Sequence, residues 1–162
     1  MAPRIIEPEP NEWREYRALR LEALQSDPDA FSATYDEAVL RPDEFWIQRL
    51  GGDDTLNFVA IVEDQMVGMV GAYLAAHDDP NCAVVIGLYV STAYRGLGLG
   101  RRLMDALLKR LAQLPTVTMI RLGVSPKQTA ALGLYQALGF EIVPQPEDGD
   151  AMQDTLRMER AA

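Results

Sequence analysis

The feature that most constrains this chain is an apolar run followed by three closely spaced glycines. Residues 83–90 are almost wholly apolar, which is typical of a strand that is covered on both faces. The segment Tyr94-Arg95-Gly96-Leu97-Gly98-Leu99-Gly100 comes next, and an amphipathic helical pattern begins near Gly100. A strand, a glycine-rich turn and a helix N-terminus together form a geometry that binds phosphate. Glycines allow close backbone approach, and unpaired N–H groups of the helix point at the anion.

The residues after this segment predict a parallel pair of strands. Leucine and methionine recur at helical spacing over 103–114, and 117–124 is the next apolar run. A strand–helix–strand unit of this kind places its two strands in parallel, with a right-handed crossover. Ser125-Pro126-Lys127-Gln128 has a capping-box pattern and proline at a first helical position, and Gly139 ends the helix that it predicts. Closing strands are expected at 141–143 and 155–159, joined by an acidic loop at 146–150.

The first half of the chain predicts a mixture of helices and antiparallel strands. A short strand is expected at 5–6, and a helix near 12–25 with Asn11 as its N-cap. Pro42 begins a short helix that ends at Gly51-Gly52. A hairpin is expected from 57–62 and 67–75 across 63–65, followed by a polar loop at 77–81.

Length and composition are those of an ordinary globular chain with one domain over residues 1–162. No apolar stretch is long enough to span a bilayer, and the acidic N-terminus does not resemble a signal peptide. The chain has one His and one Cys, so a disulfide within the chain is impossible and a His/Cys metal site is not expected. The single cysteine, Cys82, is expected to be packed in the core rather than to act as a nucleophile. These features fit a cytoplasmic protein without a metal.

The formal net charge of −9 is distributed unevenly. Residues 91–127 carry seven basic side chains and one acid, a net charge of +6, which leaves −15 for the rest of the chain. An acidic protein of this kind is not expected to bind nucleic acid in general. The basic segment around the glycines suits a polyanionic small ligand, and the acidic remainder favours a cationic second substrate or simply aids solubility.

Two families of nucleotide site do not match the glycine spacing. A dinucleotide-binding site has G-x-G-x-x-G and an acid about 20 residues later, whereas here the glycines stand at 96, 98 and 100 and Arg121 occupies the later region. A P-loop needs Gly-Lys-Ser/Thr, whereas Arg101-Arg102 follows Gly100. A dinucleotide-binding domain therefore remains only as a minor alternative, which predicts that NAD raises the thermal stability of the protein.

Two motifs resemble those of the GNAT superfamily of N-acetyltransferases. Arg95-x-x-Gly98-x-Gly100 is similar to its acyl-coenzyme-A signature [Q/R]-x-x-G-x-[G/A], and Ala131-x-x-Leu134-Tyr135-x-x-x-Gly139-Phe140 is similar to its A-x-x-L-Y-x-x-x-G-F motif. The specific part of this resemblance covers 84–140. A looser resemblance is found at 19–24 and 67–68. It implies a GNAT fold of the α+β (mixed α/β) class. Such a fold has a mixed, mostly antiparallel sheet of about six to seven strands, about four flanking helices and a parallel β-α-β coenzyme-A unit.

The resemblance also implies where acetyl-coenzyme A is bound. The pyrophosphate is expected at the backbone of the glycine turn, with the pantetheine arm pairing along the preceding strand. The cofactor-binding residues are then Leu88, Tyr89, Val90, Arg95, Gly96, Leu97, Gly98, Leu99, Gly100, Arg101, Gln128 and Tyr135. Arg102 adds positive charge nearby, and Gln128 stands where the family often has an asparagine that contacts the pantetheine amide.

Tyr135 is the catalytic residue that the resemblance implies, as the general acid that protonates the leaving thiolate. The general base stays open. The strand at 83–88 lacks the glutamate that some relatives place there, and Asp36, Glu37, Asp78, Asp79 or a water relay are the candidates. An attacking ammonium must lose a proton before it can act as a nucleophile.

The sequence thus predicts direct transfer of an acetyl group from acetyl-coenzyme A to a primary amine, which is either a small cationic amine or a peptide or protein amine. The alternative is a non-catalytic acyl-coenzyme-A-binding regulator that has lost the base. The acidic net charge and the lack of a long apolar stretch predict no nucleic-acid or membrane partner, and proteins of the resembled family are often homodimers.

Overall fold

The computed structural model describes residues 2–31, 33–145 and 155–162. The expected acidic loop at 146–150 lies outside the described residues. The strands of the described part are β1 (Arg4–Ile6), β2 (Thr55–Val62), β3 (Gln65–Tyr73), β4 (Cys82–Val90), β5 (Met119–Val124), β6 (Glu141–Val143) and β7 (Leu156–Ala161). They form one sheet in the order β1-β2-β3-β4-β5-β7-β6.

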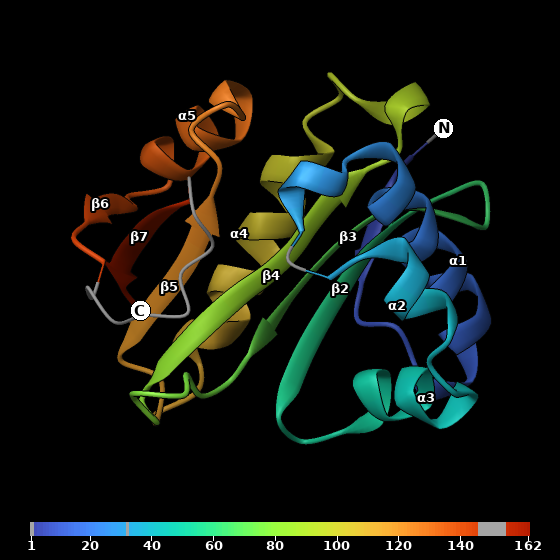
Figure 1. The fold of residues 1–162 in the computed structure, drawn as a ribbon, viewed down its shortest axis with the longest axis horizontal. Coiled ribbons are helices and arrows are strands. Elements are labelled where there is room, and N and C mark those ends of the chain that lie inside the picture. The colour runs from blue at the N-terminus through green and yellow to red at the C-terminus, as the bar shows by residue number, and fades with distance from the viewer. Residues whose placement is uncertain (1, 32, 146–154) are drawn as a thin grey trace.

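The helices divide between the two faces of this sheet (Figure 1). The α-helices of the described part are α1 (Trp13–Ser26), α2 (Tyr35–Val39), α3 (Asp43–Gly51), α4 (Leu99–Ala112) and α5 (Thr129–Ala137). Short 3-10 turns occur at Pro10–Glu12, Pro28–Ala30 and Thr92–Tyr94. The architecture confirms the mixed fold that the sequence predicts. It also contains helix α2, which the sequence did not predict.

Strand β2 illustrates how one sheet supports two cores. Side chains alternate between the faces of a strand. Phe58, Ala60 and Val62 therefore pack into the core beneath α4 and α5, whereas Val59 and Ile61 pack against α1 and α3. Strand β2 is joined to β3 by a two-residue turn, Glu63-Asp64, in which both residues have positive φ, of 50° and 65°. The sequence placed Gln65 in the turn, but Gln65 is the first residue of β3 and pairs with Val62.

The pairing of β4 with β5 is the feature that positions the site. These strands are parallel, as predicted, whereas each other pair of neighbouring strands in the described sheet is antiparallel. Helix α4 connects them and begins one residue before the predicted Gly100. Strand β5 begins at Met119, two residues after the expected start.

Candidate active site

Strands β4 and β5 separate after a short paired stretch. Their register runs from Cys82–Met119 to Val84–Arg121 and then stops, although β4 continues to Val90 and β5 to Val124 (Figure 1). A cavity of about 490 Å³ lies at this separation. Its lining includes Leu88, Tyr89, Val90, Arg95, Gly100, Gln128 and Tyr135, seven of the twelve residues that the resemblance assigned to the coenzyme.

A bulge in β4 lies beside this cleft. Ile86 pairs with Gly71 and Tyr89 with Met69, so Gly87 and Leu88 together stand opposite the single residue Val70. Gly87 has a φ of +68°, which glycine adopts without strain. A bulge leaves backbone groups of its extra residue out of the ladder. The Gly87–Leu88 backbone is therefore available to a ligand in the cleft.

The glycine turn has the conformation that its composition predicts. Gly96 and Gly98 have φ values of +79° and +78°, and Gly98 is the N-cap of α4. The first helical hydrogen bond runs from the Arg102 N–H to the Gly98 carbonyl at 3.1 Å. The earlier N–H groups of the helix have no partner within it, and Gly100 among them lines the cleft. This end of α4 is thus suited to bind an anion.

The arginines of the basic segment differ in their surroundings. Arg95 lines the cleft, where its Nε donates to the Val90 carbonyl at 2.8 Å and its guanidinium pairs with Asp27 at 3.0 Å. Arg101 pairs with Asp105 at 3.3 Å, and Arg102 donates to the Pro3 carbonyl at 3.2 Å. Arg101 and Arg102 are therefore directed at other parts of the protein.

Five of the predicted coenzyme residues lie outside the residues that line the cleft. They are Gly96, Leu97, Gly98, Leu99 and Arg101. The Leu99 side chain is buried in the core, whereas the Leu97 side chain is exposed. A role of these positions in ligand binding would therefore come from their backbone, through the turn that the glycines allow.

Tyr135 projects from α5 into the cleft and is buried, with 7% of its surface exposed. Its ring packs edge-on against Phe140, with centroids 6.0 Å apart, and its hydroxyl has no hydrogen-bond partner in the described part of the chain. Burial raises the pKa of Tyr135 to about 12. The phenol is therefore protonated at neutral pH, as a proton or hydrogen-bond donor to a ligand must be.

The capping box predicted for α5 is wrong. The Ser125 hydroxyl accepts a hydrogen bond from the Lys127 N–H at 3.3 Å, and the Gln128 N–H donates to the Ser125 carbonyl at 3.0 Å. These bonds close a turn around Pro126, so the helix begins at Thr129 with Gln128 as its N-cap. The Gln128 side chain makes no capping hydrogen bond and lines the cleft, where it is free to contact a ligand.

A second cavity, of about 370 Å³, opens on the other side of the β4 bulge. Its lining includes residues of α1, α2 and α3, of the segments between these helices, and of strands β3, β4 and β5. The two cavities share Ala30, Val85, Gly87 and Gly123 in their linings. A donor in one cavity and an acceptor in the other would therefore meet beside the Gly87 bulge.

The candidate bases separate clearly by position. Glu37 lines the second cavity, as does Asp29, which the sequence did not single out. Asp36 is exposed on the same short helix as Glu37 but does not line the cavity. Asp78 and Asp79 come before Cys82, the first residue of β4. Cys82 lies five strand residues from Gly87, which is about 16 Å at a rise of 3.3 Å per residue, so these two carboxylates lie far from the bulge.

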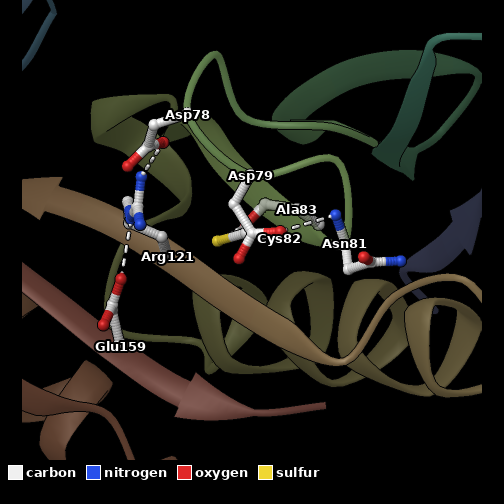
Figure 2. A network of polar contacts seen from close by, with 7 residues as sticks. All are labelled: Asp78, Asp79, Asn81, Cys82, Ala83, Arg121 and Glu159. Atoms are coloured by element: carbon white, nitrogen blue, oxygen red, sulfur yellow. Dashed lines mark hydrogen bonds and ion pairs between the residues drawn. The ribbon is translucent and has the colours of Figure 1, made fainter.

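Asp78 and Asp79 instead belong to a polar network at the start of β4 (Figure 2). Arg121 pairs with Asp78 at 2.8 Å and with Glu159 at 2.7 Å, and Asp79 accepts from the Asn81 N–H at 2.9 Å. Hydrogen bonding to Arg121 lowers the pKa of Asp78. Burial alone would lower the pKa of Arg121, but its bonds to the two carboxylates raise it overall.

We expect Arg121→Met to destabilise the fold by about 1–3 kcal/mol, because the half-buried Glu159 would lose its charged partner. Urea unfolding at neutral pH measures this difference, and Arg4→Met, an exposed arginine on β1, is the control. The Asp78 share of the stabilisation is present above its ordinary pKa of 3.8 and is lost as the pH falls through the lower folded value. Equal unfolding free energies for wild type and Arg121→Met would contradict a stabilising network.

The sequence did not predict the charged residues of the second cavity. Arg20, Arg41 and Arg49 line it, and Lys127 is a further basic residue of the first cleft. No local motif connects these arginines, and the only signal is that Arg20 lies between the buried residues Leu19 and Leu21 of an amphipathic helix. The predicted burial of Cys82 is confirmed.

The described residues contain neither a metal-binding cluster nor a helix that could span a membrane. No group of three or more His, Cys, Asp or Glu in residues 2–31, 33–145 and 155–162 is arranged to hold a metal ion. No helix in that part of the chain has the length and apolar character that a membrane span requires.

Comparison with known proteins agrees with this geometry. The model of the Acetyltransferase (GNAT) family matches residues 13–140. N-acetylaspartate synthetase of Danio rerio is 33% identical over 95 residues, which are 56% of this chain and 31% of that protein. L-methionine sulfoximine/L-methionine sulfone acetyltransferase of Salmonella typhimurium is 25% identical over 138 residues, covering 76% of this chain and 80% of that protein. The chain thus spans about a third of the first relative and most of the second.

A solved structure extends the likeness to the whole fold. The PaiA N-acetyltransferase of Thermoplasma acidophilum, determined with coenzyme A, superimposes with a TM-score of 0.76 at 18% identity, covering 100% of both chains.

Proposed function

Because this chain belongs to the acetyltransferase (GNAT) family, we propose that it transfers the acetyl group of acetyl-coenzyme A directly to a primary amine. The observation that carries the proposal is the meeting of two cavities beside the bulge in β4. The first cavity, between β4 and β5, holds the acyl donor and is the donor cleft. The second cavity holds the amine and is the acceptor cavity. The named relatives support N-acetylation, and their names mention N-acetylaspartate, L-methionine sulfoximine and L-methionine sulfone.

On this proposal the donor cleft binds acetyl-coenzyme A through its backbone. The free N–H groups at the start of α4 hold the pyrophosphate, with the positive side chain of Arg95 nearby. The pantetheine arm lies against Leu88, Tyr89 and Val90, where β4 has lost its partner strand. The Gln128 amide, which makes no cap, contacts the arm from the start of α5.

The chemistry takes place beside Gly87. The amine nitrogen attacks the thioester carbonyl carbon, a C–N bond forms, and the C–S bond breaks as the thiolate leaves. A backbone N–H of the Gly87–Leu88 bulge stabilises the negative charge that develops on the carbonyl oxygen. Tyr135 gives its proton to the leaving sulfur, and its phenolate takes up the second proton that the attacking nitrogen loses as it becomes the amide. Burial makes Tyr135 a weaker acid, but it also makes a thiolate in the same water-poor cleft a stronger base than in water, which offsets that effect.

We propose Glu37 as the carboxylate that takes the proton from the amine, directly or through a water molecule. Glu37 lines the acceptor cavity, and the Thr34 hydroxyl donates to its Oε1 at 2.9 Å, which orients the carboxylate. Glu37→Gln keeps an acceptor for Thr34 but removes the base. We expect the turnover of this variant to fall by about 10²-fold. Steady-state rates across a pH series measure the effect, and a rate for Asp36→Asn that falls as far as that of Glu37→Gln would contradict the assignment.

The test of the proposed function is release of coenzyme A thiol from acetyl-coenzyme A in the presence of a panel of amines and peptides. We expect thiol release that depends on the amine, together with formation of the N-acetylated product by mass spectrometry. Binding of acetyl-coenzyme A without thiol release for any acceptor would instead indicate a regulator that binds acyl-coenzyme A.

A further inference from the structure

The acceptor cavity contains an excess of arginine. Arg20 comes from α1, Arg41 from the segment between α2 and α3, and Arg49 from α3. The cavity lining has two carboxylates, Asp29 and Glu37. None of the three arginines forms an ion pair with a residue in the described part of the chain. Among the described residues, therefore, none neutralises these three positive charges through an ion pair.

Arg20 is the most unusual of the three. Its surface is only 9% exposed, yet its guanidinium makes no hydrogen bond or ion pair within residues 2–31, 33–145 and 155–162. Its Cζ lies 4.8 Å from the centre of the Phe31 ring. Its Nη1 lies so close to Gly87 that a Cβ there would collide with it. Arg20 therefore directs a buried positive charge at the point where the two cavities meet.

Arg49 adds a second charge to the same cavity. Its Nε is buried without a hydrogen-bond partner among the described residues, and its Cζ lies 5.5 Å from the centre of the Tyr73 ring. Burial lowers the pKa of Arg20, and the charge on Arg49 acts in the same direction. A buried charge without a partner is costly for the fold, and a neighbouring like charge adds to that cost. An anionic ligand would remove both penalties.

We propose, on the basis of the acetyl transfer proposed above, that the acceptor is an amino acid whose carboxylate binds Arg20 and Arg49 and whose amine faces Gly87. The planar guanidinium matches a carboxylate with paired hydrogen bonds. Glu37 and Asp29 supply the negative charge that an ammonium group prefers. A cavity of about 370 Å³ lies in the range of small-molecule sites, which suits a free amino acid.

This acceptor differs from the cationic amine that the net charge of the sequence favours. Net charge describes the field of the whole surface, which governs how ligands approach. The charges inside the cavity decide which ligand is held, and among the described residues of its lining there are three arginines and two carboxylates. A polyamine would leave Arg20 and Arg49 unpaired and add further positive charge.

The test compares amino acids with their amides. Thiol release from acetyl-coenzyme A is measured with each common L-amino acid, with the matching amino-acid amide, and with polyamines. For the best acceptor, we expect kcat/KM to be about 10- to 100-fold higher for the amino acid than for its amide, the difference expected when a charged hydrogen bond is lost. Arg20→Met is expected to lower kcat/KM for the amino acid by a much larger factor than for its amide, so that this preference is lost.

The same variant separates ligand binding from a structural role. Methionine replaces a buried, unpaired charge with an apolar side chain of similar length, so the melting temperature of Arg20→Met should be equal to or higher than that of the wild type. Arg14→Met, an exposed position on the same helix, is the control for kinetics and stability. A lower melting temperature together with equal losses for amino acids and amides would overturn the proposal.

A binding measurement keeps the inference distinct from the proposed function. The arginine Nε–Hε NMR signals are recorded with saturating coenzyme A while a mixture of the common L-amino acids, or of their amides, is added. We expect shifts with the amino acids that are absent with the amides and absent in Arg20→Met. Acetylation of amides or polyamines as fast as of amino acids would overturn the amino-acid site and leave acetyl transfer standing. If no amine releases thiol, the proposed acetyl transfer is wrong. Equal NMR shifts with the amino acids and with their amides would overturn the proposed carboxylate-binding site.

Discussion

Replacing Gly100 with Asp is expected to weaken the binding of acetyl-coenzyme A by about 100-fold or more, because the juxtaposition of like charges costs several kcal/mol. Gly100 lines the donor cleft at the second residue of α4, where the proposed pyrophosphate lies. An aspartate there would also occupy the N–H groups that the pyrophosphate needs.

The fold should tolerate this change. A Cβ on Gly100 would meet the Leu134 Cδ2 at 3.8 Å, which is an ordinary contact. A carboxylate in the first turn of a helix stabilises the helix by about 0.3–1 kcal/mol. The variant is therefore expected to bind the coenzyme weakly while its melting temperature stays equal to or above that of the wild type.

Calorimetric titration with acetyl-coenzyme A measures the effect. Gly100→Ala adds only the methyl group, and Gly133→Asp adds the same charge to an exposed site of α5 that does not line the cleft. Both controls should bind within a few-fold of the wild type, and Gly98→Asp is a poorer probe because Gly98 has a positive φ. Wild-type affinity of Gly100→Asp would rule out a pyrophosphate site at this turn.

The fold around the proposed donor cleft could be predicted from the sequence because its requirements are local. Gly96 and Gly98 adopt the positive φ values that a tight turn before a helix needs, and the apolar run before them forms the central strand β4. The parallel pairing of β4 with β5 follows from the helix between them. Side-chain partners were less predictable: the Ser125 hydroxyl serves a turn around Pro126, and Arg101 pairs with Asp105.

The acceptor side could not be predicted because its residues come together only in the folded chain. Arg20, Arg41 and Arg49 come from separate segments of the chain. In the sequence, each one alone is predicted to be a solvated surface charge. The close approach of Arg20 to Gly87 depends on the bulge in β4, and nothing in the apolar run 83–90 specifies that bulge except its glycine. The net charge of the chain was therefore a poor guide to the charge inside the cavity.

Tyr135→Phe is expected to lower turnover by about 10²-fold while the affinity for acetyl-coenzyme A stays nearly unchanged, since general acid catalysis contributes about 10²–10⁴-fold. The change removes one hydroxyl, which has no hydrogen-bond partner in the described residues, and keeps the ring contact with Phe140. The packing of the cleft should therefore be preserved.

The pKa of Tyr135 makes this prediction specific in its pH dependence. The group is neutral when protonated, and burial raises its pKa from 10.0 to about 12, so its neutral form persists in the fold to a higher pH than in the unfolded chain. Folding stability in wild type should therefore decline as the pH rises from 10 toward 12, and this part of the decline should be absent in Tyr135→Phe. The catalytic rate should show no loss from ionisation of Tyr135 below pH 10.

Pre-steady-state measurement of thiol release separates the acid role from other effects of the substitution. Tyr94→Phe, on the 3-10 turn Thr92–Tyr94 and outside the cleft lining, is the matched control and should turn over like the wild type. If Tyr135→Phe matches the wild type in the acetyl-transfer step itself, the leaving sulfur receives its proton from another source. A fall in coenzyme affinity as large as the fall in rate would instead assign Tyr135 to binding, because an interaction made equally in the ground state does not accelerate the chemical step.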